Sequence, residues 1–104
     1  MSRLAFTMKL RPGYANEYQK RHDQIWPELI SLLKDSGISQ YSIFLDEKTN
    51  VLFGALTVAK QENMDKLPDF PVMQRWWKYM SDIMESNPDR SPVSIHLKEV
   101  FYLP

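Results

Sequence analysis

The chain has 104 residues, and 13 basic side chains balance 13 acidic ones, so the formal net charge is zero at pH 7. This length suits one domain over residues 1–104, with room for one small pocket. Without a basic excess, neither nucleic acid nor a membrane surface is favoured as the main partner. The absence of cysteine excludes a disulfide framework, a thiolate nucleophile and a cysteine-bound metal.

No segment carries the signature of a membrane-spanning helix or of a signal peptide. The longest strongly apolar stretch, residues 51–59, is far too short to cross a bilayer. Residues 1–4 lead directly into a strand-like pattern and lack the apolar segment of a signal peptide. We therefore expect a soluble, cytoplasmic protein.

The first predicted elements are a strand and a broken helix. Residues 4–10 place their large apolar side chains at alternate positions, which is typical of a half-buried strand. Residues 14–35 have helical spacing, with Glu17 and Arg21 forming an i, i+4 pair on the outer face. Pro27 lacks the N–H group that a continuous helix needs, so we expect a kink or a break just before it.

A hairpin follows, with strands over residues 40–46 and 51–59 around a turn at 47–50. The second strand is apolar on both faces, whereas a strand in the antiparallel sheet of one domain should keep one wet face. Helices of the same chain can cover only one side of the sheet. We therefore expect a partner subunit to cover the other side.

The last part of the chain predicts a helix and a final strand. Residues 61–66 form a short helix, and Pro68 and Pro71 bracket a loop. Helical spacing of apolar side chains predicts the second main helix over residues 72–85. Alternation of apolar and polar side chains predicts a final strand over residues 93–102.

The predicted order is strand, helix, strand, strand, helix, strand. This is the split βαβ pattern of an α+β, ferredoxin-like domain, in which one antiparallel sheet carries its helices on one face. Because the other face of the sheet is also apolar, two such sheets can pack face to face as a dimeric α+β barrel.

Among the candidate functional residues, His22 stands in the middle of an aromatic stripe. Tyr18, His22 and Trp26 follow one another at steps of four, and Leu29 and Leu33 continue the same helix face. Only the imidazole on this stripe titrates near neutral pH. A lone histidine on an apolar face is more often a core residue. Because a hydroxyl and an indole group neighbour His22, the pattern here favours a pocket wall as much as a core position. The pattern suggests acid–base chemistry on a neutral small molecule.

Three other aromatic residues are candidates for the same pocket. Trp76 and Trp77 point about 100° apart on a helix, so they form either a core and a boundary residue or an aromatic corner at the pocket mouth. Tyr41 lies on the apolar face of its strand, and its hydroxyl needs a partner if it is buried. Aromatic faces suit the apolar C–H faces of sugars, while indole and phenol groups reach the sugar hydroxyls.

A metal site has little support in the sequence. His96, the only other histidine, shares a strand face with Ser94 and Lys98, and we expect it to be solvated. One inward histidine without cysteines cannot complete the usual zinc ligand set unless several carboxylates contribute. No acidic cluster accompanies His22 in the sequence.

Several sequence blocks resemble the L-rhamnose mutarotase family. They follow the expected order and span nearly the whole chain. The most specific are Trp-Trp-Lys-Tyr-Met at 76–80, within residues 74–80, and Val-Phe-Tyr-Leu-Pro at 100–104, within residues 97–104. The other blocks are residues 17–22, 25–29, 87–89 and 91–94.

The resemblance implies a cytoplasmic homodimer of ferredoxin-like subunits. It implies an enzyme that interconverts the α and β anomers of L-rhamnose without a metal or an organic cofactor. It also implies that His22 is the proton donor, and that four aromatic residues bind the sugar. These are Tyr18, Tyr41, Trp76 and Trp77.

Mutarotation requires a proton to leave the anomeric hydroxyl while the ring oxygen gains one, and a histidine suits such transfers near neutral pH. We hypothesise that His22 protonates the ring oxygen. The base stays open among a tyrosine hydroxyl, a water and a carboxylate such as Asp46 or Asp82. Two rival functions are a cofactor-free monooxygenase of the same dimeric barrel class and a non-catalytic barrel that binds a small molecule. The choice among L-rhamnose, lyxose-like and fucose-like sugars also stays open.

Overall fold

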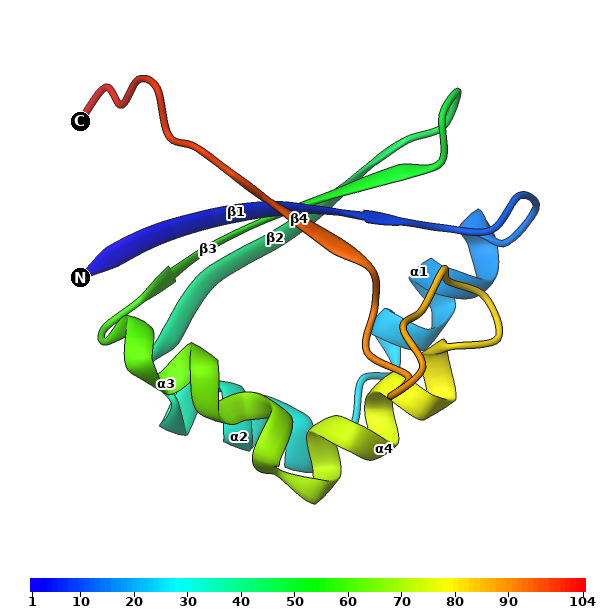
Figure 1. Ribbon diagram of the computed structural model, residues 1–104, viewed down its shortest axis with the longest axis horizontal. Helices are drawn as coiled ribbons and strands as arrows, with labels where there is room; N and C mark the ends of the chain where they lie inside the picture. Colours follow the sequence, from blue (N-terminus) through cyan, green and yellow to red (C-terminus); the bar gives the residue numbers. More distant parts are fainter.

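The computed structural model describes residues 1–104 and consists of two layers, a sheet and a set of helices on one side of it (Figure 1). The strands are β1 (Ser2–Lys9), β2 (Ile38–Asp46), β3 (Val51–Val58) and β4 (Ser94–Leu97). The helices are α1 (Ala15–Asp23), α2 (Pro27–Asp35), α3 (Gln61–Lys66), the 3-10 helix η1 (Leu67–Asp69) and α4 (Pro71–Met80). None of them has the length and apolar character that crossing a membrane requires.

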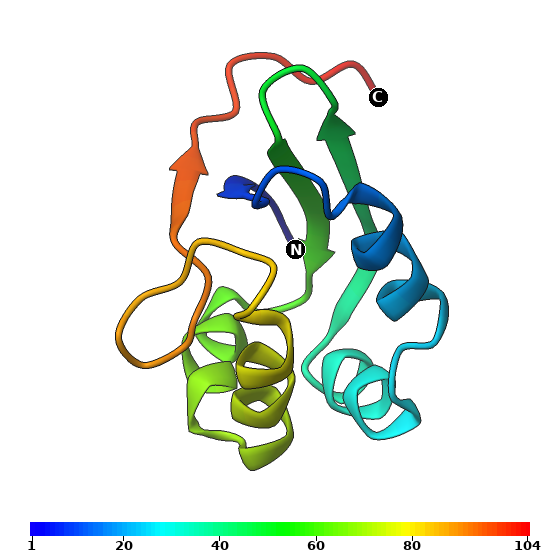
Figure 2. The ribbon, with the colours of Figure 1, turned by 90° about the vertical axis from the view of Figure 1, so that its right-hand side faces the viewer.

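The strands form one antiparallel sheet in the order β2-β3-β1-β4. This order, with helices in the crossovers on one face, confirms the predicted ferredoxin-like α+β class. Figure 2 shows α1 and α2 on the β2 side of the sheet, and α4 with the loop that follows it on the β4 side. The space between these two helical groups and the sheet is where the candidate site lies.

The predicted break at Pro27 is confirmed. α1 ends at Asp23, Trp26 has an extended backbone, and Pro27 begins α2. Proline suits the first position of a helix because its missing N–H would have no partner there. Of the stripe predicted from sequence spacing, Trp26 at this break does not line the cavity, whereas Leu29 and Leu33 of α2 do.

The second main helix ends five residues earlier than predicted, at Met80. Beyond it the chain pairs with the end of β1, where the amide of Glu85 donates to the carbonyl of Lys9 over 3.0 Å. Ile83 and Met84 are buried although they lie outside the helix. The helical spacing of these two residues therefore results from their burial and not from a helix. For this reason the predicted helix over residues 72–85 was wrong at its end.

The prediction for the last strand was also wrong in its length. β4 contains only residues 94–97, and residues 98–104 have no regular structure. In its register with β1, His96 lies opposite Phe6 and Ile95 lies opposite Thr7. Because Phe6 packs against the helix-side core, the polar side chains of β4 share that side and its apolar side chains lie on the other.

The two faces of the sheet differ in what covers them. On the helix side, Leu52 and Leu56 of β3 belong to a core of 14 buried hydrophobic residues. On the other side, the register places Phe44, Phe53 and Ile95 in one row across the sheet, and all three are exposed. Both faces of β3 are therefore apolar, but the helices cover only one of them and the other is uncovered.

Candidate active site

One cavity of about 970 Å³ lies between the sheet and the helices, and 21 of its 33 lining residues are hydrophobic. This volume lies in the range of small-molecule sites, which are mostly apolar with a few polar groups that orient the ligand. All five site residues predicted from the sequence line this cavity. They are Tyr18, His22, Tyr41, Trp76 and Trp77.

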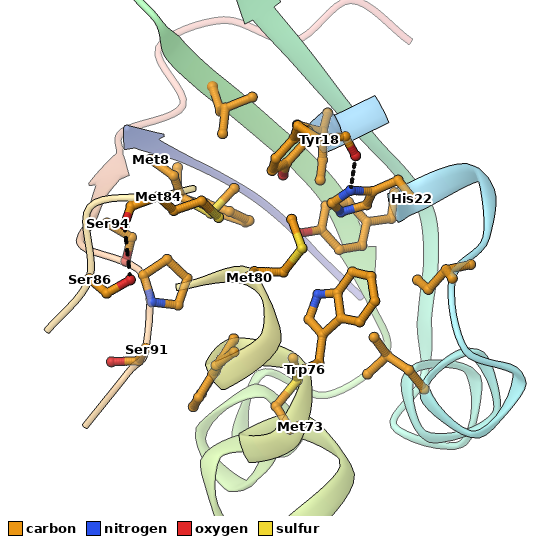
Figure 3. Close-up of a pocket in the computed structure, with 18 of the residues that line it drawn as sticks. Met8, Tyr18, His22, Met73, Trp76, Met80, Met84, Ser86, Ser91 and Ser94 are labelled. Atoms are coloured by element: carbon orange, nitrogen blue, oxygen red, sulfur yellow. Dashed lines mark hydrogen bonds between the residues drawn. The ribbon is translucent and has the colours of Figure 1, made fainter. Parts of the chain in front are cut away.

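His22 is held by its own helix. Its Nδ1 atom lies 3.0 Å from the carbonyl oxygen of Tyr18 in the preceding turn, as Figure 3 shows. A carbonyl oxygen only accepts hydrogen bonds, so the proton on this side of the ring belongs to Nδ1. The imidazole also stacks on the Tyr18 ring, with centroids 4.3 Å apart, and meets Trp76 edge-on at 5.4 Å. These contacts leave Nε2 as the nitrogen that is available for proton exchange.

Burial sets the resting charge of His22. Desolvation lowers the pKa of the imidazole below its ordinary value of 6.5, and the hydrogen bond to the Tyr18 carbonyl opposes this only in part. The ring is therefore neutral at pH 7. A neutral ring with its proton on Nδ1 presents a lone pair on Nε2, so the resting His22 accepts a proton.

Tyr18 and Tyr41 bring two protonated hydroxyls to the cavity wall. Burial raises the pKa of Tyr18 well above its usual range, and the nearby Tyr41 adds to this effect. Desolvation also raises the pKa of Tyr41, to about 12, although 38% of that residue is exposed. Both groups therefore stay neutral at pH 7. They suit hydrogen bonds to a neutral ligand, whereas neither suits the role of a base.

The two neighbouring tryptophans share the cavity wall unequally. Trp76 is buried and Trp77 is half-buried, and both line the cavity. Trp26 meets the Trp76 ring edge-on, with centroids 5.1 Å apart, but it does not line the cavity. The sequence stripe had placed Trp26 beside His22; the break before α2 makes it a supporting neighbour of Trp76 instead.

The two carboxylates considered as bases lie elsewhere. Asp46 accepts the backbone N–H of Lys48 over 3.0 Å and ends β2 on the uncovered face of the sheet. Asp82 pairs with Arg21, whose hydrogen bond lowers the pKa of this carboxyl. Neither residue lines the cavity, where Glu47 of the β2–β3 turn is the one carboxylate. No three histidine or acidic side chains lie close enough together to hold a metal ion.

The sequence profile of the L-rhamnose mutarotase family matches residues 3–103. The chain belongs to the L-rhamnose mutarotase family. An L-rhamnose mutarotase of Brucella anthropi is 56% identical over 102 residues, which cover 98% of this chain and 96% of that protein. An L-rhamnose mutarotase of Jannaschia sp. is 55% identical over 104 residues, which cover both chains completely.

Solved structures agree with this membership in the L-rhamnose mutarotase family. The crystal structure of an L-rhamnose mutarotase from Formosa agariphila superposes with a TM-score of 0.94 at 52% identity, over 100% of both chains. A protein of Mycobacterium tuberculosis reaches a TM-score of 0.62 at 10% identity, over 99% of this chain and 100% of its own. An antibiotic biosynthesis monooxygenase reaches 0.52 at 11%, over 96% and 99%. The last two likenesses show a shared fold alone.

The sequence analysis did not predict the wall of the cavity that lies opposite Tyr18 and His22. This wall comes from β4 and the loop after α4, and Figure 3 shows its serines across the cavity from Tyr18 and His22. Its polar residues are Ser86, Asn87, Arg90, Ser91, Ser94 and His96. His96 is exposed, as expected, but it lies on the cavity side of the sheet. The sequence analysis assigned the face of His96 to solvent, and the alternation did not indicate that this face borders the cavity.

Proposed function

We propose that this protein is an isomerase that interconverts the α and β anomers of L-rhamnose by opening and closing the pyranose ring. Family membership over residues 3–103 supports the reaction and the substrate. The observation that carries the chemistry is the imidazole of His22, which is tied at Nδ1 and leaves Nε2 for proton exchange in an aromatic cavity. Membership in this family also favours mutarotation over the monooxygenase and over the non-catalytic binder.

The aromatic wall would hold the sugar. Trp76 and Trp77 offer flat apolar surfaces to its C–H faces, and their indole N–H groups can reach hydroxyls. The hydroxyls of Tyr18 and Tyr41 would bind further sugar hydroxyls, since both remain protonated at neutral pH. A neutral sugar suits a wall in which hydrogen-bonding groups outnumber charged ones.

His22 would carry one proton between two oxygens of the sugar. The neutral ring takes the proton of the anomeric hydroxyl on Nε2. The imidazolium then gives this proton to the ring oxygen while the bond between C1 and that oxygen breaks and C1 becomes an aldehyde. Rotation about the bond between C1 and C2, followed by the reverse steps, closes the ring with the other anomeric configuration.

This route keeps the predicted donation from His22 to the ring oxygen and needs no separate base. Both sugar oxygens are bonded to C1, so one nitrogen can reach each of them in turn. The positions of Asp46 and Asp82 outside the cavity wall and the protonated state of both tyrosines remove these four residues as bases. A route through His22 alone also requires neither Glu47 nor His96, the other titratable acceptors in the wall.

Saturation-transfer NMR of anomer exchange on L-rhamnose tests this proposal. His22→Ala should slow exchange by roughly 10²–10⁴-fold, the usual contribution of general acid–base catalysis. Asp46→Asn is the matched control and should exchange anomers at the parent rate. An unchanged rate in a folded His22→Ala variant would remove His22 from the reaction. Sugar binding by the parent without exchange would point to the non-catalytic barrel, and oxygen consumption with an aromatic ligand to the monooxygenase.

We also propose that the protein works in the cytoplasm as a homodimer, with residues 1–104 forming one domain in each subunit. The uncovered sheet face supports the dimer, because Phe44 and Ile95 are each 65% exposed there. Contiguous apolar surfaces of this kind mark protein interfaces. A second copy that packs the same face would bury both rows of side chains in a barrel with two-fold symmetry.

A further inference from the structure

We propose that Phe6 and Gly54 are positioning residues for the reaction, because together they set the place of the Tyr41 side chain at the cavity wall. The inference rests on the proposed function, in which Tyr41 binds the sugar. It concerns two residues of β1 and β3 that touch neither His22 nor the tryptophans in any contact described above.

Gly54 makes room for the Phe6 ring. The two residues lie opposite each other in the pairing of β1 with β3. A Cβ atom on Gly54 would lie 2.6 and 2.7 Å from two atoms of the Phe6 ring, which is closer than real contacts allow, and 3.1 Å from a third. The backbone of Gly54 does not have a positive φ, so conformation is not the reason for a glycine. The missing side chain is what lets the ring lie across β3.

The Phe6 ring in turn supports Tyr41. Their centroids lie 6.2 Å apart with an angle of 68° between the planes, which is a favourable edge-on arrangement of two aromatic rings. Both residues line the cavity. The Phe6 ring, which occupies the space above Gly54, therefore packs against the side of Tyr41, the residue proposed to bind the sugar.

The backbone at Tyr41 makes this support necessary. The pairing of β2 with β3 shifts between Ser39 and Ser42, so Tyr41 lies in a β-bulge without a paired partner. Gln40 has a φ of 52°, and its side-chain oxygen accepts a hydrogen bond of 3.3 Å from the hydroxyl of Thr57. Bulges redirect side chains. Tyr41 lies on the same side of β2 as Ile43, which also lines the cavity, but no strand pairing holds its backbone, so Phe6 limits where its ring can lie.

The experiment measures kcat and KM for L-rhamnose from anomer exchange over a range of sugar concentrations. In Gly54→Ala the new methyl group displaces the end of the Phe6 ring, which is a side-chain shift that leaves the strand backbone in place. KM should rise about tenfold, the loss of roughly one hydrogen bond, with kcat within about twofold of the parent. Phe6→Leu should give a similar rise in KM because Tyr41 loses its wall.

A double variant separates positioning from general damage. Once the ring is absent, Gly54→Ala should have no further effect, so Phe6→Leu combined with Gly54→Ala should match Phe6→Leu alone. Leu4→Ala is the matched control, since Leu4 lies on the same face of β1 outside the cavity wall. It should lower the melting temperature and leave KM unchanged. Additive KM effects in the double variant, or a raised KM in Leu4→Ala, would overturn the positioning role.

Tyr41→Phe distinguishes this inference from the proposed function. A raised KM in Tyr41→Phe together with a parental KM in Gly54→Ala would refute the positioning role alone. A parental KM in Tyr41→Phe would refute the sugar-binding role of Tyr41, and the positioning role with it. The expected result is a raised KM in Tyr41→Phe and in Gly54→Ala. In the Phe6→Leu background, adding Gly54→Ala should raise KM no further.

Discussion

Arg21 reaches from α1 to Asp82 beyond the end of α4, with 2.9 Å between its Nη1 atom and the carboxylate Oδ1. The same guanidinium donates to the carbonyl of Tyr79 over 2.7 Å and pairs with Glu17 within α1. Its side chain is only 11% exposed, so the pair predicted for the outer face of the helix is a clamp between two helices. Because His22 is the next residue, this clamp fixes the helix turn that carries it.

Loss of the Arg21 clamp should reduce stability and activity together. Arg21→Met keeps much of the packing and removes every hydrogen bond, so we expect a loss of about 1–2 kcal/mol, kept low because Asp82 is mostly exposed. Anomer exchange should fall as α1 shifts on α4. Denaturant unfolding and saturation-transfer NMR measure the two effects. Arg21→Lys should recover only part of the stability and of the exchange rate, since lysine lacks the planar fork of donors. Complete recovery would mean that only the positive charge at this position matters and not the hydrogen bonds.

The pH dependence of exchange should have one acidic limb that belongs to His22. Burial lowers the pKa of this imidazole below 6.5, so the neutral form that accepts the anomeric proton persists through neutral pH. As the pH falls through the lowered pKa, Nε2 gains a proton and kcat/KM should decrease. Rates measured across the acidic range test the sign. A rate that increases on acidification would mean that the imidazolium is the resting form in use and that a separate base exists.

Tyr18→Phe should weaken sugar binding without destabilising the protein. No hydrogen bond contributes to the raised pKa of Tyr18, so its hydroxyl has no strong partner in the chain to lose. The ring that stacks on His22 remains in the variant. We expect a KM about tenfold higher, in line with one lost hydrogen bond, and an unchanged melting temperature. A large fall in melting temperature would instead identify Tyr18 as a core residue.

A charge on the uncovered sheet face should separate the proposed dimer. Ile95→Glu places a carboxylate in the apolar row, where burial of an unpaired charge is costly. Sedimentation should show the parent at twice the 12.3 kDa chain mass and the variant as a monomer. Gln24→Glu adds the same charge at the exposed end of α1 and should leave the dimer intact. A monomeric parent would contradict the proposal directly.

Local signals in the sequence were sufficient for much of the fold. Pro27 predicted the break between the helices, and the alternation of residues 4–10 predicted the inner face of β1. Signals failed where tertiary pairing replaced local preference. Ile83 and Met84 have helical spacing because both are buried, yet their segment pairs with the end of β1.

The site was predictable where its residues lie within one helix turn or within a family motif. Spacing placed Tyr18 and His22 together, residue positions marked Tyr41, Trp76 and Trp77 as pocket candidates, and the family resemblance implied their sugar-binding roles. Contacts between distant segments carry no local signal, so the support of Tyr41 by Phe6 and the clamp from Arg21 to Asp82 emerged only from the structure.

The hydrogen bond between His22 Nδ1 and the Tyr18 carbonyl has a consequence for how this family can diversify. The proton-transferring group takes its tautomer from the backbone of its own helix turn, so five consecutive residues carry the chemistry. The other walls of the cavity come from several elements, among them β1, β2, α4, β4 and the loop before β4. Substitutions in these walls can therefore change which sugar is accepted while the proton-transfer unit stays intact.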